Sequence, residues 1–420
     1  MNETWRWRPL GELFAIGAGK TMSAAARNGA SKTPFLRTSN VLWDEIDLTS
    51  VDEMAIPDHE LSGKSLRRGD LLVCEGGEIG RAAIWNGQVE PMSFQNHLHR
   101  LRPIVPDIEP RFYVFFFQSA FTQLGIFEGA GNRTTIPNLS RSRLAELSVP
   151  HPSLGEQQAI STALGRVRDA LEVQGQSLTT AQALKHTTMH TLFTSGLRGE
   201  PQKETEIGPV PESWDVVTIE EICDIASGGT PRKSIAEYWG GAIPWVSGKD
   251  LKSPSLSDSI DHVTEEGAQA ASRLVPEGSV LLLVRGMGLA KDLPVAVIER
   301  PMTFNQDIKA LMPRGDYPGR LLRSAIYAGK ERLLSHVVTS AHGTMTLTLR
   351  DVQRFRAPRP SDPSEINAIV AILDTIDRKA DFHRRKRDVL QELFKSLLHK
   401  LMTGEVRVHD LALPTAGGSR

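Results

Sequence analysis

The sequence predicts an α+β protein in which two copies of one globular domain are separated by two long antiparallel helices that form a coiled coil with pseudo-twofold symmetry. Three observations predict this architecture. The chain repeats itself at a constant offset, its globular parts contain short apolar runs between turn residues, and two other segments contain few Gly or Pro. These two segments repeat apolar residues at helical spacing, so we expect them to form the helices.

The composition is typical of a soluble, multidomain protein. A chain of 420 residues is too long to fold around one ordinary hydrophobic core. A content of 40% hydrophobic and 24% charged residues fits a globular protein. No apolar run reaches the roughly 18 residues that a membrane span needs, and residues 1–10 lack the apolar core of a secretion signal. Cys74 and Cys223 are too few for a disulfide framework or a zinc site. We therefore expect a cytoplasmic protein without a bound metal.

The chain carries an internal duplication. Trp5 recurs as Trp214, an offset of 209 (214 − 5), and Glu156 recurs as Glu365 at the same offset (365 − 156). Other matched pairs are Glu12 with Glu221, Gly69 with Gly278, Phe94 with Phe304, and Ile160 with Ile369. A nearly constant offset along the chain indicates duplication of a domain-sized unit and excludes a short-repeat solenoid.

Each copy begins with a globular part and ends with a helical part. The globular parts, 1–152 and 201–360, alternate short apolar runs with turn residues, which predicts short strands and some helix. The helical parts are 153–200 and 361–410, and 411–420 is predicted to be a flexible tail.

Both helical parts have recognisable ends. Ser153 is the predicted N-cap of the first helix, and Gly196 is its predicted stop. Ser361 or Asp362 caps the second helix, which stops at Gly404.

The two helical parts share an apolar seam whose spacing alternates between three and four residues, the heptad pattern that makes helices supercoil. The seam residues are Ile160, Leu164, Val167, Leu171 and Leu178 in the first helix, and Ile369, Leu373, Ile376, Leu390, Phe394, Leu397 and Leu401 in the second. Gln174, Lys185 and Thr188 occupy core-type positions of the first seam, so this helix should need a partner. We expect the duplicate helix to be that partner; the alternative is that each helix packs only on its own domain.

Two local motifs resemble a known family. Gly228-Gly229-Thr230-Pro231, followed by the segment 238–246 with its Tyr-Trp-Gly-Gly start, is similar to the opening of a target recognition domain in the specificity subunits of type I restriction–modification systems. Ile136-Pro137-Asn138-Leu139, followed by Glu156-Gln157-Gln158, resembles that family's exit into its helix. The first copy lacks the Thr-Pro and Tyr-Trp-Gly-Gly elements, and the second exit lacks Glu-Gln-Gln.

The resemblance implies a fold and a function. Two target recognition domains would each contact one half of an asymmetric, interrupted sequence in double-stranded DNA. The helices would act as a fixed spacer and would bind two methyltransferase (modification) subunits, with restriction or motor subunits as further candidate partners. S-adenosylmethionine and ATP would then be bound by those partners, and this chain would hold no cofactor.

Residues that could contact DNA are polar or basic side chains in loops, because such groups reach base edges and phosphates. In the first copy the candidates are Lys32, Arg37, Asn40, Arg81, Gln95, Asn96, Asn132, Arg133 and Thr134. In the second they are Lys233, Lys249, Lys252, Arg285, Lys291, Asn305, Gln306, His342 and Thr344. The alternative for each is an ordinary solvated residue or, for the amides after Phe94 and Phe304, a brace within a turn.

Charge and motif searches limit the other functions. The net charge of −1 means that any basic surface must be local. Gly17 to Thr21 ends like a phosphate-binding loop, but Phe14 stands where that loop needs glycine. His97 and His99 would point to opposite faces of a strand, a poor metal pair. No methyltransferase motif occurs, so we expect no catalysis; the alternatives are an adaptor for proteins or glycans and a stand-alone nuclease or methyltransferase.

Overall fold

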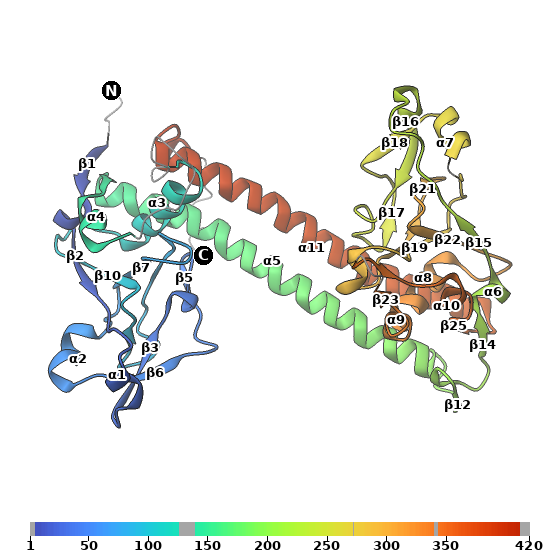
Figure 1. Ribbon diagram of the computed structural model, residues 1–420, viewed down its shortest axis with the longest axis horizontal. Coiled ribbons are helices and arrows are strands. Elements are labelled where there is room, and N and C mark those ends of the chain that lie inside the picture. The colour runs from blue at the N-terminus through green and yellow to red at the C-terminus, as the bar shows by residue number, and fades with distance from the viewer. Residues whose placement is uncertain (1–4, 126–138, 272, 340–342, 412–420) are drawn as a thin grey trace, which may run out of the picture. The chain divides into compact units, whose positions relative to one another are not determined.

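The computed structural model describes residues 5–125, 139–271, 273–339 and 343–411. The chain divides into two compact units, and each contains one globular domain and part of both long helices (Figure 1). Unit 1 contains 1–173 and 387–420, and unit 2 contains 174–386. No helix in the described part is long and apolar enough to cross a membrane.

The domain of unit 1 is built on a four-stranded antiparallel sheet with the order β2-β10-β7-β8. A second sheet has the order β6-β3-β9, and β1 pairs with β11. The strands are β1 Arg6–Pro9, β2 Phe14–Ala18, β3 Lys32–Leu36, β4 Val41–Leu42, β5 Glu45–Ile46, β6 Asp52–Ala55, β7 Leu71–Cys74, β8 Ala82–Ile84, β9 Ser93–Phe94, β10 Leu98–Pro103 and β11 Ser148–His151. The helices are α1 Ala24–Asn28, α2 Asp58–Lys64, α3 Pro110–Thr122, α4 Arg141–Glu146 and α5 Leu154–Ser195.

The domain of unit 2 has a five-stranded sheet with the order β15-β22-β19-β20-β17 and a second sheet with the order β18-β16-β21. Its strands are β12 Gln202–Thr205, β13 Gly208–Pro211, β14 Asp215–Thr218, β15 Cys223–Ser227, β16 Trp239–Val246, β17 Ser255–Leu256, β18 Asp261–Val263, β19 Val280–Leu283, β20 Val295–Ile298, β21 Thr303–Phe304, β22 Ile308–Pro313, β23 Val338–Thr339, β24 Met345–Thr346 and β25 Arg356–Arg359. Its helices are α6 Ile219–Ile222, α7 Glu265–Ala271, α8 Gly319–Ala328, α9 Lys330–Leu334, α10 Leu349–Gln353 and α11 Pro363–Thr403.

The two domains share one topology, as the duplication predicts. In each main sheet the strand that comes first in the chain pairs with the strand that comes last. The last strand then pairs on its other side with an intermediate strand, which gives the order β2-β10-β7 in unit 1 and β15-β22-β19 in unit 2. In each second sheet one neighbour is antiparallel and the other parallel. The α+β class with duplicated domains is therefore confirmed.

Local signals explain where the elements begin and end. Gly69 and Gly278 precede the buried strands β7 and β19, and both have a positive φ, of 90° and 82°, which glycine adopts without strain. The apolar run after each glycine forms a fully buried strand. Helix α3 buries its aromatic residues from Phe112 to Phe117 in the core of the unit 1 domain.

The ends of the long helices follow the predicted caps. The Ser153 hydroxyl accepts a hydrogen bond from the Glu156 amide at 3.3 Å, and α5 is followed by Gly196 at a φ of 60°. Of the two candidate caps of α11, Asp362 accepts from the Ser364 amide at 2.8 Å. Gly404 follows α11 with a φ of 74°.

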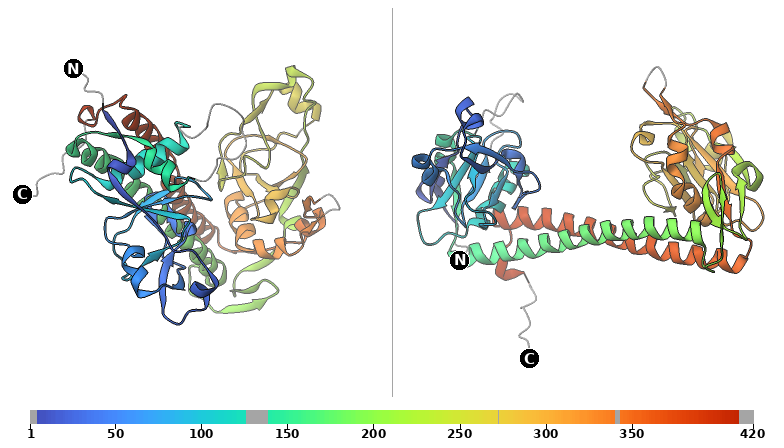
Figure 2. Two further views of the ribbon diagram at one scale, coloured as in Figure 1. Left: turned by 60° about the vertical axis from the view of Figure 1, so that its left-hand side comes forward. Right: turned by 90° about the horizontal axis from the view of Figure 1, so that it is seen from below.

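Within each unit the two long helices lie side by side and run antiparallel (Figures 1 and 2). In unit 2 Leu178 and Ala181 of α5 cluster with Ala380 of α11. In unit 1 Leu164 and Leu401 belong to one apolar cluster, the core of the domain itself. Every residue of the predicted seam is buried or partly buried. The helices therefore pack both on each other and on their domains, so the two alternatives left by the sequence coexist.

Equivalent Arg, Glu and Trp residues of the duplication come together at the helix ends in both units, although the Trp contact differs. In unit 2 the Arg198 guanidinium lies 3.9 Å from the Glu365 carboxylate, which also accepts from the Trp214 indole at 3.2 Å. In unit 1 the equivalent Arg407 lies 2.7 Å from Glu156 and stacks over the Trp5 ring at 5.2 Å. We call each set an Arg–Glu–Trp clasp. Each clasp joins the start of one helix to the residues after the end of the other.

One equivalent pair of glycines, Gly19 and Gly228, lies directly against backbone in the two domains. A Cβ on Gly19 would come within 2.2 Å of the Gln95 carbonyl oxygen, and a Cβ on the equivalent Gly228 within 2.2 Å of the Phe304 carbonyl oxygen. Such distances cannot be relieved by a side-chain rotation, because the neighbouring atoms belong to the main chain. Both positions therefore require glycine.

Gly228→Ala should destabilise the protein by about 3 kcal/mol or more, because the new methyl group forces the main chain apart. Gly175→Ala is the matched control, since a Cβ there meets nothing within 4 Å. Gly175 lies within α5, so alanine should stabilise the protein by about 0.5–1 kcal/mol. Calorimetric unfolding of the full chain measures both changes, and equal unfolding temperatures for the two variants would contradict the close approach.

Candidate nucleic-acid interface

The unit 1 domain has a shallow depression where several strands end. It lies beyond the ends of β3, β7 and β9 and before the start of β10. Its lining residues are Arg37, Thr38, Ser39, Gly76, Gly77, Gln95 and His97. Arg37 and Gln95 were predicted from the sequence to contact DNA, and the depression brings them together. The exposed His97 was not among the predicted residues.

The equivalent loops of unit 2 follow β16, β19 and β21. They carry Lys249, Arg285 and Gln306, which were predicted to contact DNA and are all exposed. The Gln306 side-chain oxygen accepts a hydrogen bond from the Thr230 hydroxyl at 2.7 Å. Because the strands are equivalent, these loops occupy the same position in the unit 2 domain as the depression does in unit 1.

Two of the exposed cations form pairs that a ligand could replace. Arg37 lies 3.0 Å from Asp52, and Lys249 lies 2.7 Å from Asp261. The hydrogen bond that the Lys249 ammonium donates to Asp261 raises the pKa of Lys249, which keeps this ammonium charged at neutral pH. Exposed ion pairs are screened by solvent and contribute little, so a phosphate can compete for either cation.

Three predicted residues have structural roles instead. The Asn40 side-chain amide donates to the carbonyl oxygens of Asp47 and Ser50, and its oxygen accepts from the Arg37 amide, so its hydrogen-bonding groups are used inside the domain. Asn305 is buried and bonds to Asp307. The Arg81 side chain is 14% exposed and bonds to Glu78 and Thr38. In this structure these three side chains brace turns, the alternative that the sequence left open for Asn305.

The remaining predicted residues divide by position. Four of them are exposed in loops or at strand starts: Lys32, Lys233, Lys252 and Lys291. Two others, Asn96 and Thr344, are partly buried. Asn132, Arg133, Thr134 and His342 lie outside the described residues. The depression and its equivalent therefore bring together only part of the predicted set.

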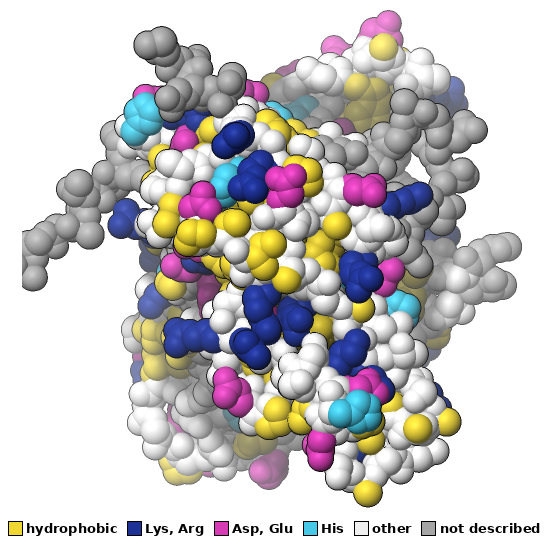
Figure 3. Space-filling view, turned by 90° about the vertical axis from the view of Figure 1, so that its left-hand side faces the viewer, with side chains coloured by type: hydrophobic (Ala, Val, Ile, Leu, Met, Phe, Trp, Pro, Cys, Tyr) yellow, Lys and Arg dark blue, Asp and Glu magenta, His cyan; other side chains and the backbone are white. Residues whose placement is uncertain are grey.

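A basic face in unit 1 was missed by the sequence analysis. Lys and Arg side chains gather on the face of the unit 1 domain that carries β2 and α2 (Figure 3). The face consists of Lys64, Arg100 and the cations whose charges act on one of these two. These are Lys20, Arg67, Arg102 and Arg141. The sequence signal that could have found it is the alternation of Arg100 and Arg102, which places both side chains on one face of β10.

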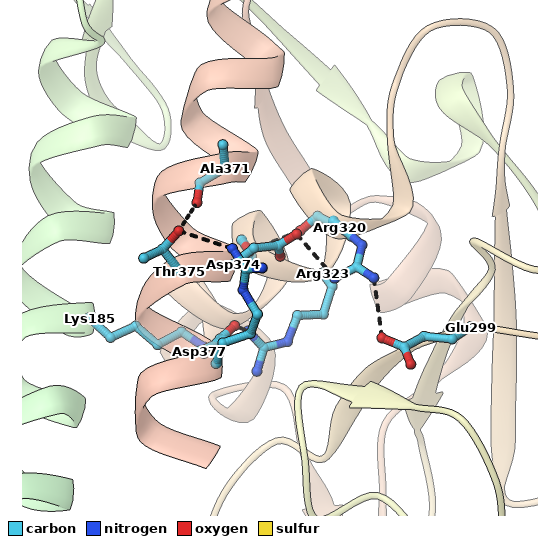
Figure 4. Close-up of polar contacts among 10 residues, drawn as sticks. Lys185, Glu299, Arg320, Arg323, Ala371, Asp374, Thr375 and Asp377 are labelled. Atoms are coloured by element: carbon cyan, nitrogen blue, oxygen red, sulfur yellow. Dashed lines mark hydrogen bonds and ion pairs between the residues drawn. The ribbon is translucent and has the colours of Figure 1, made fainter. Parts of the chain in front are cut away.

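Unit 2 contains a buried charge cluster that joins its domain to both long helices (Figure 4). Lys185 of α5 and Arg323 of α8 both pair with Asp377 of α11. Arg323 is 6% exposed, and burial, reinforced by the Arg323 charge, lowers the pKa of Lys185 to about 8. At the rim of the cluster Arg320 bridges Asp374 and Glu299. The cluster fixes α8 against both helices.

Unit 1 makes the corresponding joint with different chemistry. Arg111 of α3 lies 2.8 Å from the buried Asp44 carboxylate, and Arg168 of α5 lies 3.6 Å from it. Phe115 of α3 meets Phe394 of α11 edge to face, with ring centroids 6.1 Å apart. Phe394 stands 209 positions after Lys185 (394 − 185), so an aromatic contact replaces the buried ammonium.

The basic run in the middle of α11 is largely paired within the helix. Arg384 and Arg385 both lie within ion-pair distance of Asp381, and Arg387 lies 3.3 Å from Asp388. Arg385 remains 81% exposed, so it can still reach a ligand or partner.

Comparison with known proteins gives one family. The family model described as the type I restriction modification DNA specificity domain matches residues 2–180 and 211–392. The two matches cover the two copies of the duplication.

Curated relatives carry the same description. The chain is 32% identical over 221 residues to the MjaIX type I restriction enzyme specificity subunit of Methanocaldococcus jannaschii. It is 29% identical over 253 residues to the EcoR124I/EcoR124II specificity subunit of Escherichia coli. These alignments cover 49% and 60% of this chain. The chain spans about half the length of the first relative (48%) and 59% of the second. At 23% identity, the putative MjaX specificity subunit of M. jannaschii aligns over 97% of this chain and 94% of its own.

Solved structures share the fold. The type I restriction–modification S subunit from M. genitalium matches with a TM-score of 0.64 at 17% identity, covering 96% of each chain. A chain from a study of complex assembly and conformational transition in the type I system matches with a TM-score of 0.54 at 19% identity, covering 97% of this chain and 99% of its own.

Asp377→Asn should destabilise unit 2 by about 3–5 kcal/mol, because Lys185 and Arg323 would remain buried without their carboxylate. Asp374→Asn is the control on the same helix; its pair with Arg320 is partly exposed, so the expected loss is about 1 kcal/mol or less. Denaturant unfolding measures both, and adding Lys185→Met to Asp377→Asn should restore part of the stability. Similar destabilisation by the two single variants would show that the buried cluster does not join the elements.

Proposed function

Because the chain belongs to the type I restriction–modification DNA specificity family, we propose that it reads a bipartite, asymmetric DNA sequence and directs methyltransferase and restriction subunits to it. The observation that carries this proposal is the pair of equivalent loop clusters with different side chains. One has Arg37, Gln95 and His97, and the other has Lys249 and Gln306. Equivalent loops that carry different donors and acceptors suit two different half-sites.

The side chains in these loops suit both parts of DNA recognition. Arg37 and Lys249 can bind phosphates once their exposed carboxylate partners are displaced. Gln95 and Gln306 carry amides, which can donate to and accept from one base edge. Arg285, exposed beside the positive-φ Gly286, is a candidate for guanine.

We propose further that this chain is not itself catalytic. Burial raises the pKa of the Cys74 thiol to about 11 and that of the Cys223 thiol to about 12. Both thiols therefore stay protonated at neutral pH and are poor nucleophiles. In this proposal S-adenosylmethionine and ATP are bound by the partner subunits, and the chain works in the cytoplasm, where those partners meet the chromosome.

Two copies of the methyltransferase subunit are the stoichiometry that the duplication favours. Each unit presents an equivalent Arg–Glu–Trp clasp and an equivalent pair of helix segments. Two similar surfaces can bind two copies of one partner in the same way. We propose that these helix segments provide the binding surfaces.

Replacing residues 208–358 with the corresponding segment of a relative should change one half-site of the methylated sequence and leave the other intact. The reason is that this segment holds the unit 2 domain but neither long helix. The reciprocal exchange of residues 5–151 is the matched control and should change only the other half-site. Methylome sequencing of both hybrids reads the result, and a hybrid that alters both half-sites would contradict modular reading.

Adding one heptad to both long helices should widen the gap between the half-sites, if these helices set it. The insertions belong at facing positions, after Gly175 in α5 and after Asp381 in α11, because Gln174 faces His383 and the seam then keeps its pairing. Seven residues add roughly 10 Å of helix, the length of about three base pairs. Methylome sequencing measures the gap, and a methylated sequence with an unchanged gap would refute the spacer role.

A further inference from the structure

The basic face of unit 1 consists of four cations held by hydrogen bonds and two exposed cations, Arg67 and Arg141. The Arg100 guanidinium donates to the Gly63 and Ser65 carbonyl oxygens at 3.0 and 3.2 Å, and the Lys64 ammonium donates to the Ala18 carbonyl oxygen at 2.7 Å. Arg67 and Arg141 are exposed, and neither pairs with an acid among the residues that the structure describes. The hydrogen bonds therefore hold charge in place, and Arg67 and Arg141 remain available to a ligand.

The charge on this face is not balanced locally. Among the residues that the structure describes, two of its six cations pair with a carboxylate: Lys20 with Glu60 at 2.7 Å and Arg102 with Asp70 at 2.6 Å. Burial lowers the pKa of Arg100, and the neighbouring Arg102 and Arg67 lower it further. Like charges held this close repel one another, so an anion bound on the face would be stabilised. Because the chain as a whole has a net charge of −1, the local excess of positive charge on this face does not follow from the composition of the chain.

The same face of unit 2 keeps arginine at the positions of Lys64 and Arg141 (Arg273 and Arg350, offset 209) but lacks other cations of the unit 1 face. The strand that corresponds to β10 is β22, which has Ala310 and Met312 where β10 has Arg100 and Arg102 (offset 210). Gly229 stands at the position of Lys20 (offset 209). The duplication has therefore kept the fold of the two domains but only part of this charge, so the face is more basic in unit 1 than in unit 2.

The basic face is continuous with the proposed DNA-reading loops. Lys20 forms a β-bridge with Gln95, and its amide donates to the Phe94 carbonyl oxygen at 2.9 Å. Gln95 lines the depression, and Arg100 follows on β10 and covers the Phe94 ring, with its guanidinium carbon 5.7 Å from the ring centroid. A strand of DNA leaving the depression would meet these cations next.

We propose that the basic face formed by Lys20, Lys64, Arg67, Arg100, Arg102 and Arg141 binds backbone phosphates of the DNA that flanks the half-site read by unit 1. This inference rests on the proposed function and adds an interaction that carries no sequence information. The continuity with Gln95 favours DNA over an acidic protein surface. The interaction is made once per chain, so it lengthens the footprint on one side of the target only.

The test uses the complex of this chain with its methyltransferase subunits and two target duplexes. One duplex ends at the unit 1 half-site, and the other continues about ten base pairs beyond it, about one helical turn. The wild-type complex should bind the longer duplex more tightly. The double variant Arg67→Glu/Arg141→Glu should abolish that preference. It should weaken binding of the longer duplex on the order of tenfold and lower the salt slope by about 0.9 for each phosphate that is no longer neutralised.

Arg350→Glu is the matched control, because Arg350 is exposed on α10 at the position equivalent to Arg141 (350 − 141 = 209). It should leave the length preference unchanged, and both variants should retain the wild-type methylated sequence. The inference is overturned if the double variant keeps the length preference, or if it releases methyltransferase subunits while retaining its DNA affinity. Absence of any sequence-specific binding by the wild-type complex would instead refute the proposed function.

Discussion

The pairing of the two long helices within each unit is the constraint on which the structure depends. Each unit contains the start of one helix and the end of the other, and an Arg–Glu–Trp clasp joins them: Arg198 with Glu365 in unit 2, and Arg407 with Glu156 in unit 1. The seam residues near these ends also belong to the core of the adjacent domain. Neither domain can complete its core without both helices, which couples the folding of the two copies.

Buried polar groups fix the register of this helix pair. In unit 2 the Gln174 oxygen lies 2.8 Å from the His383 ring nitrogen, and these positions are equivalent in the duplication (383 − 174 = 209). Sliding one helix by a turn would also remove Lys185 from Asp377 and leave a buried charge unpaired. Apolar seam residues alone would tolerate such a shift more easily.

Features that follow from local order in the sequence could be predicted, and those that depend on distant contacts could not. The caps at Ser153 and Asp362 and the duplicated fold follow from residue types at fixed spacing. The burial of Asn40 could not be predicted, because its partners Asp47 and Ser50 are brought to it by a turn. The basic face was missed for a similar reason, since β10 and α2 contribute to it from different parts of the chain.

The central claim is that two equivalent domains on a shared helix pair read one interrupted DNA sequence for partner enzymes. Single-molecule mapping of methylated bases in the host genome, with and without this gene, tests it most directly. The account predicts one asymmetric sequence with two specific parts and a constant gap, which loses its methylation when the gene is deleted. A methylation pattern that does not change on deletion would contradict it.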